Sequence, residues 1–283
     1  MGNLFKMKLL RFIGYFSQLS ALIGPRGASV FAVAFLYRKT FPPREGELAT
    51  ISVGPYTFHF PSVVYFEGLF TEIFFKETYY LARTDKPIRV IDCGANIGVS
   101  LLYIKIRAPG ARVMCFEPNP AARAVLGKNI AENNWGNDVQ VFPYALGKKK
   151  GSVEFFVENK VATSSGGSVT KHLEKRGRNL DSSMVEVDIL SHYIEGPIDF
   201  LKIDIEGGEF DVLEELIAHN TLRYVAQVQL EYHYIPEFFT RTLNEMLTLL
   251  ETNGFHTFVR SAAMPHQIVG HDTMHTYMIF AWR

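Results

Sequence analysis

Apolar runs and amphipathic stretches alternate along most of the chain, with the spacing expected of strands followed by helices. The predicted strands are 88–93, 111–117, 139–144, 198–204, 224–231, 254–260 and 275–282. The predicted helices are 97–107, 120–133, 207–218 and 238–253. Such regular alternation is typical of an α/β fold in which a doubly wound sheet carries helices on both faces.

The N-terminal part of the chain does not follow this alternation. A helical arm ends at Pro42-Pro43, and the segment Thr50–Phe60 alternates as a short hairpin does. We therefore divide the chain into an extension, residues 1–80, and a sheet domain, residues 81–283.

The first strand of the sheet ends in the sequence VIDCGANIG, residues 90–98, which is the most informative motif of the chain. Glycine accepts positive φ and lets a ligand approach the backbone, and the helix that follows points its N-terminal amides at the loop. Strand, glycine loop and helix form the cradle of a nucleotide-type cofactor. The candidate cofactor residues here are Asp92, Gly94, Ala95, Asn96 and Gly98.

The second strand ends in Glu117-Pro118, about 20 residues after the glycine loop, where an acid accepts hydrogen bonds from ribose hydroxyls. The loop lacks the G-x-G-x-x-G spacing of a pyrophosphate binder. Asp92 would repel a pyrophosphate but suits the cationic amino-acid part of S-adenosylmethionine. This favours S-adenosylmethionine over NAD.

Four segments together resemble the FkbM-type S-adenosylmethionine-dependent methyltransferases: VIDCGANIG, FEPNP at 116–120, ALG at 145–147 and FLKIDIEGGEFDVLEEL at 200–216. The resemblance covers about residues 68–231, and the last segment is its specific part. It implies a class I methyltransferase, Rossmann-like fold with an antiparallel last strand. It also implies that Ala145 lies at the cofactor.

Ionisable side chains gather where the fourth and fifth strands of the sheet end. They are Asp204, Glu206, Glu231 and His233, and ligands of open α/β sheets bind at this edge. Methyl transfer to a neutral hydroxyl needs a base, and His233 or a carboxylate with a raised pKa could serve. A divalent cation held by the acids is the alternative. Glu209 is expected to be a first-turn residue that stabilises the helix dipole.

Residues 68–81 have the aromatic spacing of a helix and precede the first sheet strand. Glu72, Glu77, Tyr79 and Tyr80 could face the cofactor loop from this segment, or its aromatics could serve only to bury the helix. The polar segment 159–180 is expected to bind the acceptor or to be a surface insertion.

The net charge limits the expected partners, and the cysteine content indicates the cellular compartment. With 29 basic and 29 acidic side chains the net charge is +0, which disfavours nucleic acid as the main partner. Cys93 and Cys115 suit packing inside strands in a reducing compartment, so we expect a cytoplasmic protein.

The extension is locally basic, because seven Lys and Arg residues and no acid precede Glu45. One helical face of residues 1–40 is apolar, so the arm could lie peripherally on an anionic membrane. It could instead cover the core or a second subunit of a homo-oligomer. Neither apolar run reaches the roughly 18 residues that span a bilayer, because Pro25-Arg26-Gly27 interrupts them.

We expect an O-methyltransferase that acts on a hydroxyl of a glycan or glycolipid-type acceptor. The chain lacks the D/N-P-P-Y/F tetrapeptide of methyltransferases that act on the amino groups of nucleic-acid bases. It also lacks a cysteine placed as a nucleophile. Three alternatives stay open: O-methylation of a polyketide or other natural product, an NAD-dependent sugar oxidoreductase, and a cofactor-binding module without turnover.

Overall fold

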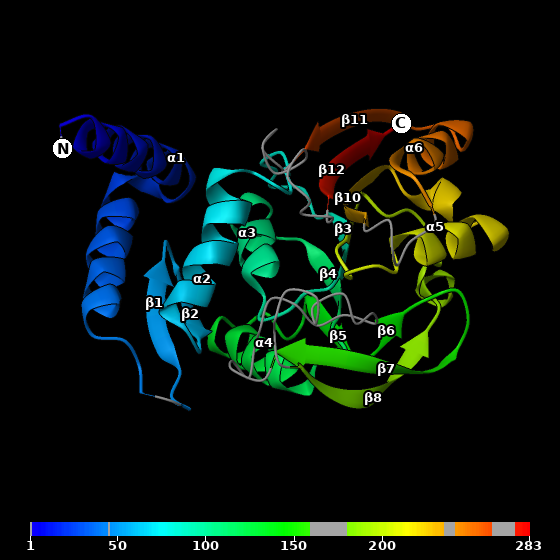
Figure 1. Cartoon of the computed structure of the whole chain (residues 1–283), viewed down its shortest axis with the longest axis horizontal. Helices are drawn as coiled ribbons and strands as arrows, with labels where there is room; N and C mark the ends of the chain where they lie inside the picture. The colour runs from blue at the N-terminus through cyan, green and yellow to red at the C-terminus, as the bar shows by residue number, and fades with distance from the viewer. Residues whose placement is uncertain (1, 45, 159–179, 235–240, 262–274) are drawn as a thin grey trace.

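A seven-stranded sheet forms the centre of the computed structural model, which describes residues 2–44, 46–158, 180–234, 241–261 and 275–283 (Figure 1). The strand order is β11-β12-β10-β9-β3-β4-β5. Their bounds are β3 Arg89–Cys93, β4 Arg112–Phe116, β5 Val139–Phe142, β9 Phe200–Ile203, β10 Gln227–Tyr234, β11 His256–Ser261 and β12 His275–Trp282. Only β12 runs antiparallel to its neighbours in this sheet. This confirms the class I methyltransferase fold, including the antiparallel last strand.

Helices cover both faces of the sheet, as the alternating pattern predicted. One face carries α3 (Val99–Arg107) and α4 (Pro120–Glu132), and the other carries α5 (Glu209–Ala218) and α6 (Leu243–Thr252). Two short 3₁₀ turns, η3 (Leu190–Tyr193) and η4 (Leu222–Tyr224), join the second layer. Each face therefore has its own buried apolar cluster.

Local signals explain where these helices begin. The side chain of Asn119 accepts a hydrogen bond from the Ala121 amide, and Pro120 occupies the first turn of α4. Thr242 and Glu245 form a capping box, so α6 begins at Leu243. The predicted start at residue 238 lies in a segment, 235–240, that is outside the described residues.

The extension packs against the α3 and α4 face, where it shares one apolar cluster with the sheet domain. It consists of α1 (Gly2–Thr40), a hairpin of β1 (Ala49–Val53) and β2 (Tyr56–Phe60), α2 (Val63–Phe70) and the π-helical turn η1 (Thr71–Phe75). Stacked phenylalanine rings join α1 to α2 and η1. The hairpin is confirmed, whereas the division at residue 80 stays a prediction.

One predicted helix has the wrong bounds. Instead of 68–81, helical structure runs from Val63 to Phe75, because Ser62 caps α2 by accepting a hydrogen bond from the Tyr65 amide. Glu77 then takes a positive φ of 48°, which ends the helical path. Tyr79 therefore lies in a loop and not on a helix.

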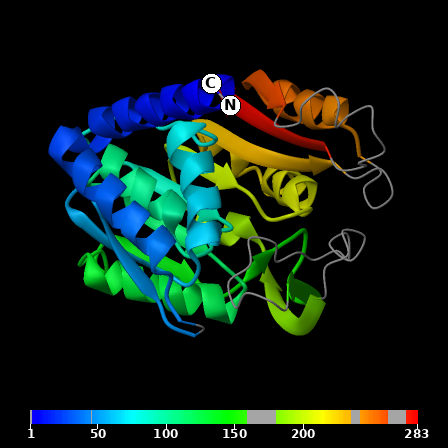
Figure 2. The same ribbon diagram turned by 60° about the vertical axis from the view of Figure 1, so that its left-hand side comes forward.

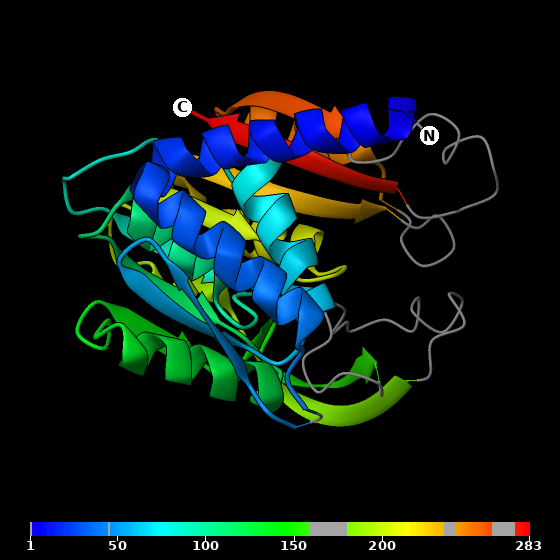
Figure 3. The ribbon, with the colours of Figure 1, turned by 90° about the vertical axis from the view of Figure 1, so that its left-hand side faces the viewer.

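The helix α1 is broken at Gly24, where φ is 78° and ψ is 157°. Figure 3 shows its two straight pieces meeting at an angle. In the described part of the chain, Ile13–Thr40 is one helix that could cross a membrane by length and composition, with a mean hydropathy of 1.6. Core helices and signal sequences pass the same test, and 17% of the apolar window is buried inside the structure. The interruption of the apolar run that was predicted near Pro25 corresponds to the break at Gly24.

A small second sheet of three strands follows β5 in the chain (Figure 2). It contains β6 (Ala145–Leu146), β7 (Gly151–Glu158) and β8 (Leu180–Asp188). The segment that the sequence predicts as an acceptor loop lies between β7 and β8, and residues 159–179 are outside the described residues. Its function stays a prediction.

Candidate active site

The glycine loop bends sharply where β3 ends, and Gly94 is the residue that permits the bend. Its φ is 84°, and a Cβ atom there would lie 1.8 Å from the carbonyl oxygen of Asp204. The amides of Gly94 and Ala95 donate to the carbonyl oxygen of Phe116, at 2.9 and 3.1 Å. The loop is therefore packed against the ends of two neighbouring strands, and only glycine fits at this position.

The second half of the loop leads directly into α3. Gly98 has a φ of 92°, and a Cβ atom there would lie 2.7 Å from a methyl carbon of Leu126. Asn96 also has positive φ, and its side-chain oxygen accepts a hydrogen bond from the Ile97 amide at 2.7 Å. Two glycines and one asparagine thus shape a tight loop at a helix N-terminus, the geometry that suits a cofactor.

Glu117 joins this loop to the next one. One of its carboxylate oxygens accepts a hydrogen bond from the Asn96 amide and the other accepts one from the Asn119 amide, both at 2.8 Å. Burial raises the pKa of Glu117 to about 7, although these two amides act in the opposite direction. Each oxygen keeps a second lone pair, so the carboxylate can still accept from a ribose hydroxyl.

Asp92 has a different place from the one that the sequence predicted. Its carboxylate is completely buried below the loop, 3.0 Å from Nζ of Lys202, and it accepts a hydrogen bond from the Ser100 hydroxyl at 2.5 Å. Lys202 also donates to the carbonyl oxygen of Gly94 at 3.0 Å. Asp92 therefore supports the loop through Lys202, and its direct contact with the cofactor stays a prediction.

The Tyr65 hydroxyl, contributed by α2, is buried without a well-formed hydrogen bond among the described residues, and the nearby Asn96 side chain lowers its pKa. Burial raises its pKa, and the negative charges of Glu117, Asp204 and Glu206 add to the increase. The hydroxyl therefore lies near both Glu117 and the acid cluster described below. An orphaned donor at this place fits a polar ligand in the cradle, and sequence patterns held no signal for it.

Two further expected cofactor residues lie at the same edge. The carbonyl oxygen of Pro118 accepts a hydrogen bond from the Arg123 guanidinium at 2.6 Å, which holds the turn after Glu117. Ala145 is buried in β6, beside Val187 of β8. Direct contact of Pro118 and Ala145 with the cofactor stays a prediction.

The predicted acids do come together beyond the loop. Asp204 directly follows β9, and its carboxylate accepts a hydrogen bond from the Tyr79 hydroxyl at 2.9 Å. The same hydroxyl lies 3.1 Å from the carboxylate of Glu231 in β10. Burial, followed by the negative charge of Asp204, raises the pKa of Glu231 to about 8. At neutral pH this carboxyl group therefore carries a proton.

His233 lies at the centre of three carboxylates. Its Nδ1 is 3.1 Å from Glu209, and its Nε2 is 3.5 Å from Glu206 and 3.7 Å from Glu231. Burial alone would lower the pKa of His233, but the three acids raise it well above its usual value. The three acids therefore favour the imidazolium form of the ring. Glu209, expected only as a first-turn residue, is also a buried partner of this ring.

A divalent cation could be held by three of these groups. Single ligand atoms of Asp204, Glu206 and His233 lie within 4.8 Å of one another. Glu209 would orient His233 through Nδ1, as carboxylates do behind metal-bound histidines. Ion pairing with the imidazolium offsets part of this negative charge without an ion.

The extension supplies part of this site. Burial and the charge of Asp204 raise the pKa of Glu72, which comes from η1. The Tyr79 ring lies 4.9 Å from Nζ of Lys202. Tyr80, by contrast, is 45% exposed and lies over Arg107. Glu72 and Tyr79 are thus the two residues of the predicted segment that belong to the site.

Comparison with known proteins decides the family. The family model described as "Methyltransferase FkbM domain" matches residues 92–257, more than half of the chain. The chain belongs to the FkbM methyltransferase family. It is therefore an S-adenosylmethionine-dependent methyltransferase, and the NAD-dependent oxidoreductase alternative is wrong.

Two proteins of similar sequence agree with this assignment. Methyltransferase sdnD of Sordaria araneosa is 28% identical over an alignment of 173 residues. The match covers 52% of this chain and 67% of that protein. The 31-O-demethyl-FK506 methyltransferase FkbM of Streptomyces tacrolimicus is 25% identical over 214 residues, 66% of this chain and 80% of that one. A crystal structure of an FkbM methyltransferase from Methylobacillus flagellatus KT is 16% identical, with a TM-score of 0.47, over 97% of this chain and 60% of that chain.

Proposed function

We propose that this FkbM-family protein transfers a methyl group from S-adenosylmethionine to a hydroxyl oxygen of a glycan or glycolipid-type acceptor. The observation that carries the proposal is the cluster of carboxylates beside the glycine loop. Asp204 lies against Gly94 and shares the Tyr79 hydroxyl with Glu231. A hydroxyl acceptor needs such groups, because it must be oriented and must lose a proton.

A natural product is the second candidate acceptor. The name of one relative, 31-O-demethyl-FK506 methyltransferase, states O-methylation of such a compound. This supports oxygen as the methylated atom in the present protein. The two proposals differ only in the class of acceptor. The acceptor experiment below therefore includes glycans, glycolipids and natural products.

Glu231 is the candidate base in our proposal. When bound, S-adenosylmethionine supplies the electrophilic methyl carbon on its sulfonium. A carboxylate with a pKa of about 8 is a stronger base than an ordinary glutamate, and the site keeps Glu231 only 15% exposed. Either His233 or a carboxylate with a raised pKa was expected as the base. We favour Glu231, because the three acids around His233 favour the charged form of that ring. Its positive charge instead stabilises the ionised Glu231 after the acceptor is bound.

Cofactor binding is tested by calorimetry with S-adenosylmethionine, S-adenosylhomocysteine and NADH. We expect the first two to bind and NADH not to bind. Glu117→Ala removes the ribose acceptor and should weaken S-adenosylhomocysteine binding by about tenfold to a hundredfold. Glu186→Ala, an exposed acid of β8, is the matched control. Binding that is equal in both variants would contradict the assigned place of the cofactor.

The acceptor is tested by transfer of a radiolabelled methyl group to glycans, glycolipids and polyhydroxylated macrolides. Label on a glycan or glycolipid that resists mild base, as an ether does, supports the first proposal. Label only on macrolides supports the second. Label on nitrogen or on a carboxylate would contradict O-methylation of a hydroxyl.

A divalent cation is the alternative device for activating the hydroxyl. It would be held by Asp204, Glu206 and His233. Activity that falls on chelation and returns with Mg²⁺ or Mn²⁺ would favour it. Turnover that is unchanged by a chelator would favour the metal-free arrangement.

A further inference from the structure

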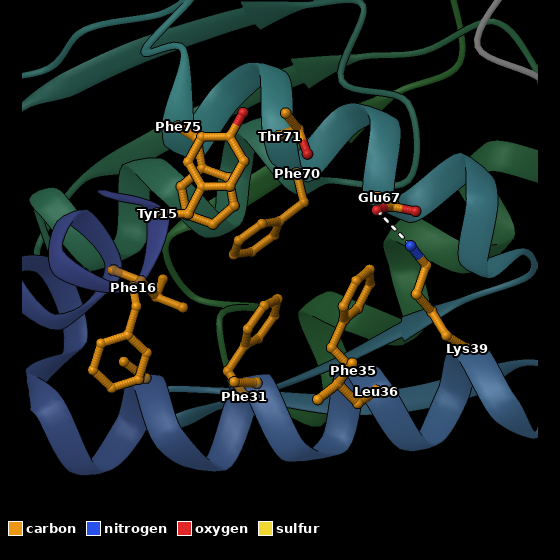
Figure 4. A pocket seen from close by; sticks show the side chains of 13 residues that line it. Tyr15, Phe16, Phe31, Phe35, Leu36, Lys39, Glu67, Phe70, Thr71 and Phe75 are labelled. Carbon is orange, nitrogen blue, oxygen red and sulfur yellow. Dashed lines mark hydrogen bonds and ion pairs between the residues drawn. The ribbon is translucent and has the colours of Figure 1, made fainter. Parts of the chain in front are cut away.

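A hollow lies between α1 and the helical pair α2 and η1, and Asp204, Glu206, Glu231 and His233 do not line it (Figure 4). Its volume is about 250 Å³, smaller than the roughly 300–1,000 Å³ that suits drug-sized ligands. The lining is almost entirely hydrocarbon. The residues that form its walls are Phe16, Leu19, Phe31, Phe35, Phe70 and Phe75.

Polar groups stand only at the edge of this hollow. Figure 4 shows Lys39 and Glu67 at one end, joined by an ion pair of 2.8 Å in which both side chains are partly exposed. Tyr15 stacks on Phe75 at 4.2 Å on the opposite side. A narrow apolar space with a charged end has the chemistry of a site for one hydrocarbon chain whose head group stays in water.

The hollow continues onto an exposed apolar face of the same helix. Leu36 lines the hollow and is 58% exposed, so the hollow meets solvent at this residue. Val30, Val33 and Tyr37 follow on the outward face of α1, and each is more than half exposed. A monomeric soluble protein rarely leaves such a continuous apolar surface uncovered.

The charge around this surface indicates what covers it. Residues 13–44 carry Arg26, Arg38, Lys39 and Arg44 and no acid. Arg26, Lys39 and Arg44 are exposed, and of these Lys39 is paired with Glu67. Basic side chains beside an exposed apolar helix face match the anionic surface of a membrane, where both contribute to binding. A second copy of the chain would bring the same positive charges together.

We propose that the hollow is a binding site for one acyl chain of an anionic membrane phospholipid, with the outer face of α1 lying on the membrane. The site lies outside the methyltransferase match of residues 92–257. It does not depend on which acceptor is methylated. The acyl chain enters beside Leu36, and the anionic head group of the lipid stays near the basic residues.

The test uses the purified full-length chain and cis-parinaric acid, a fluorescent long-chain fatty acid. Ala32→Trp places an indole in the hollow from α1, and we expect it to weaken binding of the probe by at least about tenfold. Val33→Trp adds the same bulk on the outward face and should bind the probe as the wild-type protein does. Equal binding by both variants, or no saturable binding by the wild-type protein, would overturn the proposal.

The source of the chain is tested by sedimentation with vesicles. The wild-type protein should pellet with vesicles that contain phosphatidylglycerol and remain in solution with pure phosphatidylcholine. Ala32→Trp should pellet less. Failure to pellet with the anionic vesicles, or a wild-type dimer that Ala32→Trp converts to a monomer, would contradict the lipid assignment.

Folding of the variants is checked by S-adenosylhomocysteine binding, which does not involve the hollow. If Ala32→Trp fails this check, Thr71→Phe fills the hollow from the opposite wall and replaces it. Loss of probe binding with cofactor binding intact is the supporting result. Because methyl transfer is measured separately, failure of the lipid site leaves the proposed O-methylation unaffected.

Discussion

The hydroxyl of Tyr79 lies 2.9 Å from a carboxylate oxygen of Asp204, although 125 positions separate the two residues in the chain. The same hydroxyl is 3.1 Å from Glu231. The Tyr79 hydroxyl has one proton to donate, so it can donate to only one carboxylate at a time. When Glu231 is protonated, Tyr79 donates to Asp204 and accepts a hydrogen bond from Glu231, and both contacts are satisfied. The raised pKa of Glu231, about 8, is consistent with this arrangement. A loop of the extension thereby holds the two candidate catalytic acids at a set distance.

Tyr79→Phe should therefore lower kcat by about tenfold, the equivalent of one hydrogen bond to a charged group of about 1.5 kcal/mol. KM for S-adenosylmethionine should change by less than about twofold, because the ring remains over Lys202. Steady-state kinetics with both substrates measures the two values. Tyr80→Phe is the control, since that side chain is largely exposed. A tenfold loss in the control would mean that the loop as a whole, and not the hydroxyl, is responsible.

Glu231→Gln should lower kcat by about 10²–10⁴-fold, because it removes the candidate base. In the wild-type protein, activity should rise with pH through about 8 as this carboxyl group loses its proton. The variant should lack that rise. A pH profile of kcat/KM between pH 6 and 9 distinguishes the two. An unchanged profile in the variant would assign the base role to another group.

The same carboxyl group predicts how stability depends on pH. The folded state keeps a proton on Glu231 up to about pH 8, whereas the unfolded chain releases it near the ordinary value of 4.5. The folded state thus binds more protons between these values, so the free energy of unfolding falls as pH rises from 4.5 to 8. Thermal unfolding of Glu231→Gln should show a weaker fall, by at least about 2 °C in Tm across this window. Parallel curves would contradict the raised pKa.

Lys202→Met should destabilise the protein by about 3–5 kcal/mol, because it leaves the buried carboxylate of Asp92 without its partner. Adding Asp92→Asn to the same chain should restore part of this loss, since the uncompensated charge is then gone. Urea unfolding of the single and double variants measures the coupling. Purely additive losses would show that Lys202 does not stabilise the protein through Asp92.

Gly94→Ala should abolish cofactor binding or prevent folding, because the new Cβ would collide with the Asp204 carbonyl oxygen. Gly127→Ala in α4 is the matched control. No atom lies within 4 Å of its added Cβ, and alanine favours a helix by up to about 1 kcal/mol. Calorimetry and thermal unfolding compare the two. Normal binding by Gly94→Ala would mean that the loop moves away from β9.

Much of the fold follows from local sequence. Apolar runs and helical patterns located the strands and helices of the sheet domain, because the central strands are buried on both faces and each helix buries one face. The glycines of VIDCGANIG indicated the loop, since only glycine takes the backbone shape at Gly94 and Gly98. The helix predicted at 68–81 failed at Glu77, whose positive φ is a single-residue event that periodicity does not detect.

The sequence by itself determined which edge of the sheet carries the site. Parallel strands end at one edge, so the residues that follow β3, β4, β9 and β10 meet there. Only the tertiary structure decided which of them pair with one another. Asp92 proved to be a partner of Lys202, and His233 the centre of three acids. Such pairings depend on strand register and side-chain direction, and these depend on contacts between residues far apart in the chain.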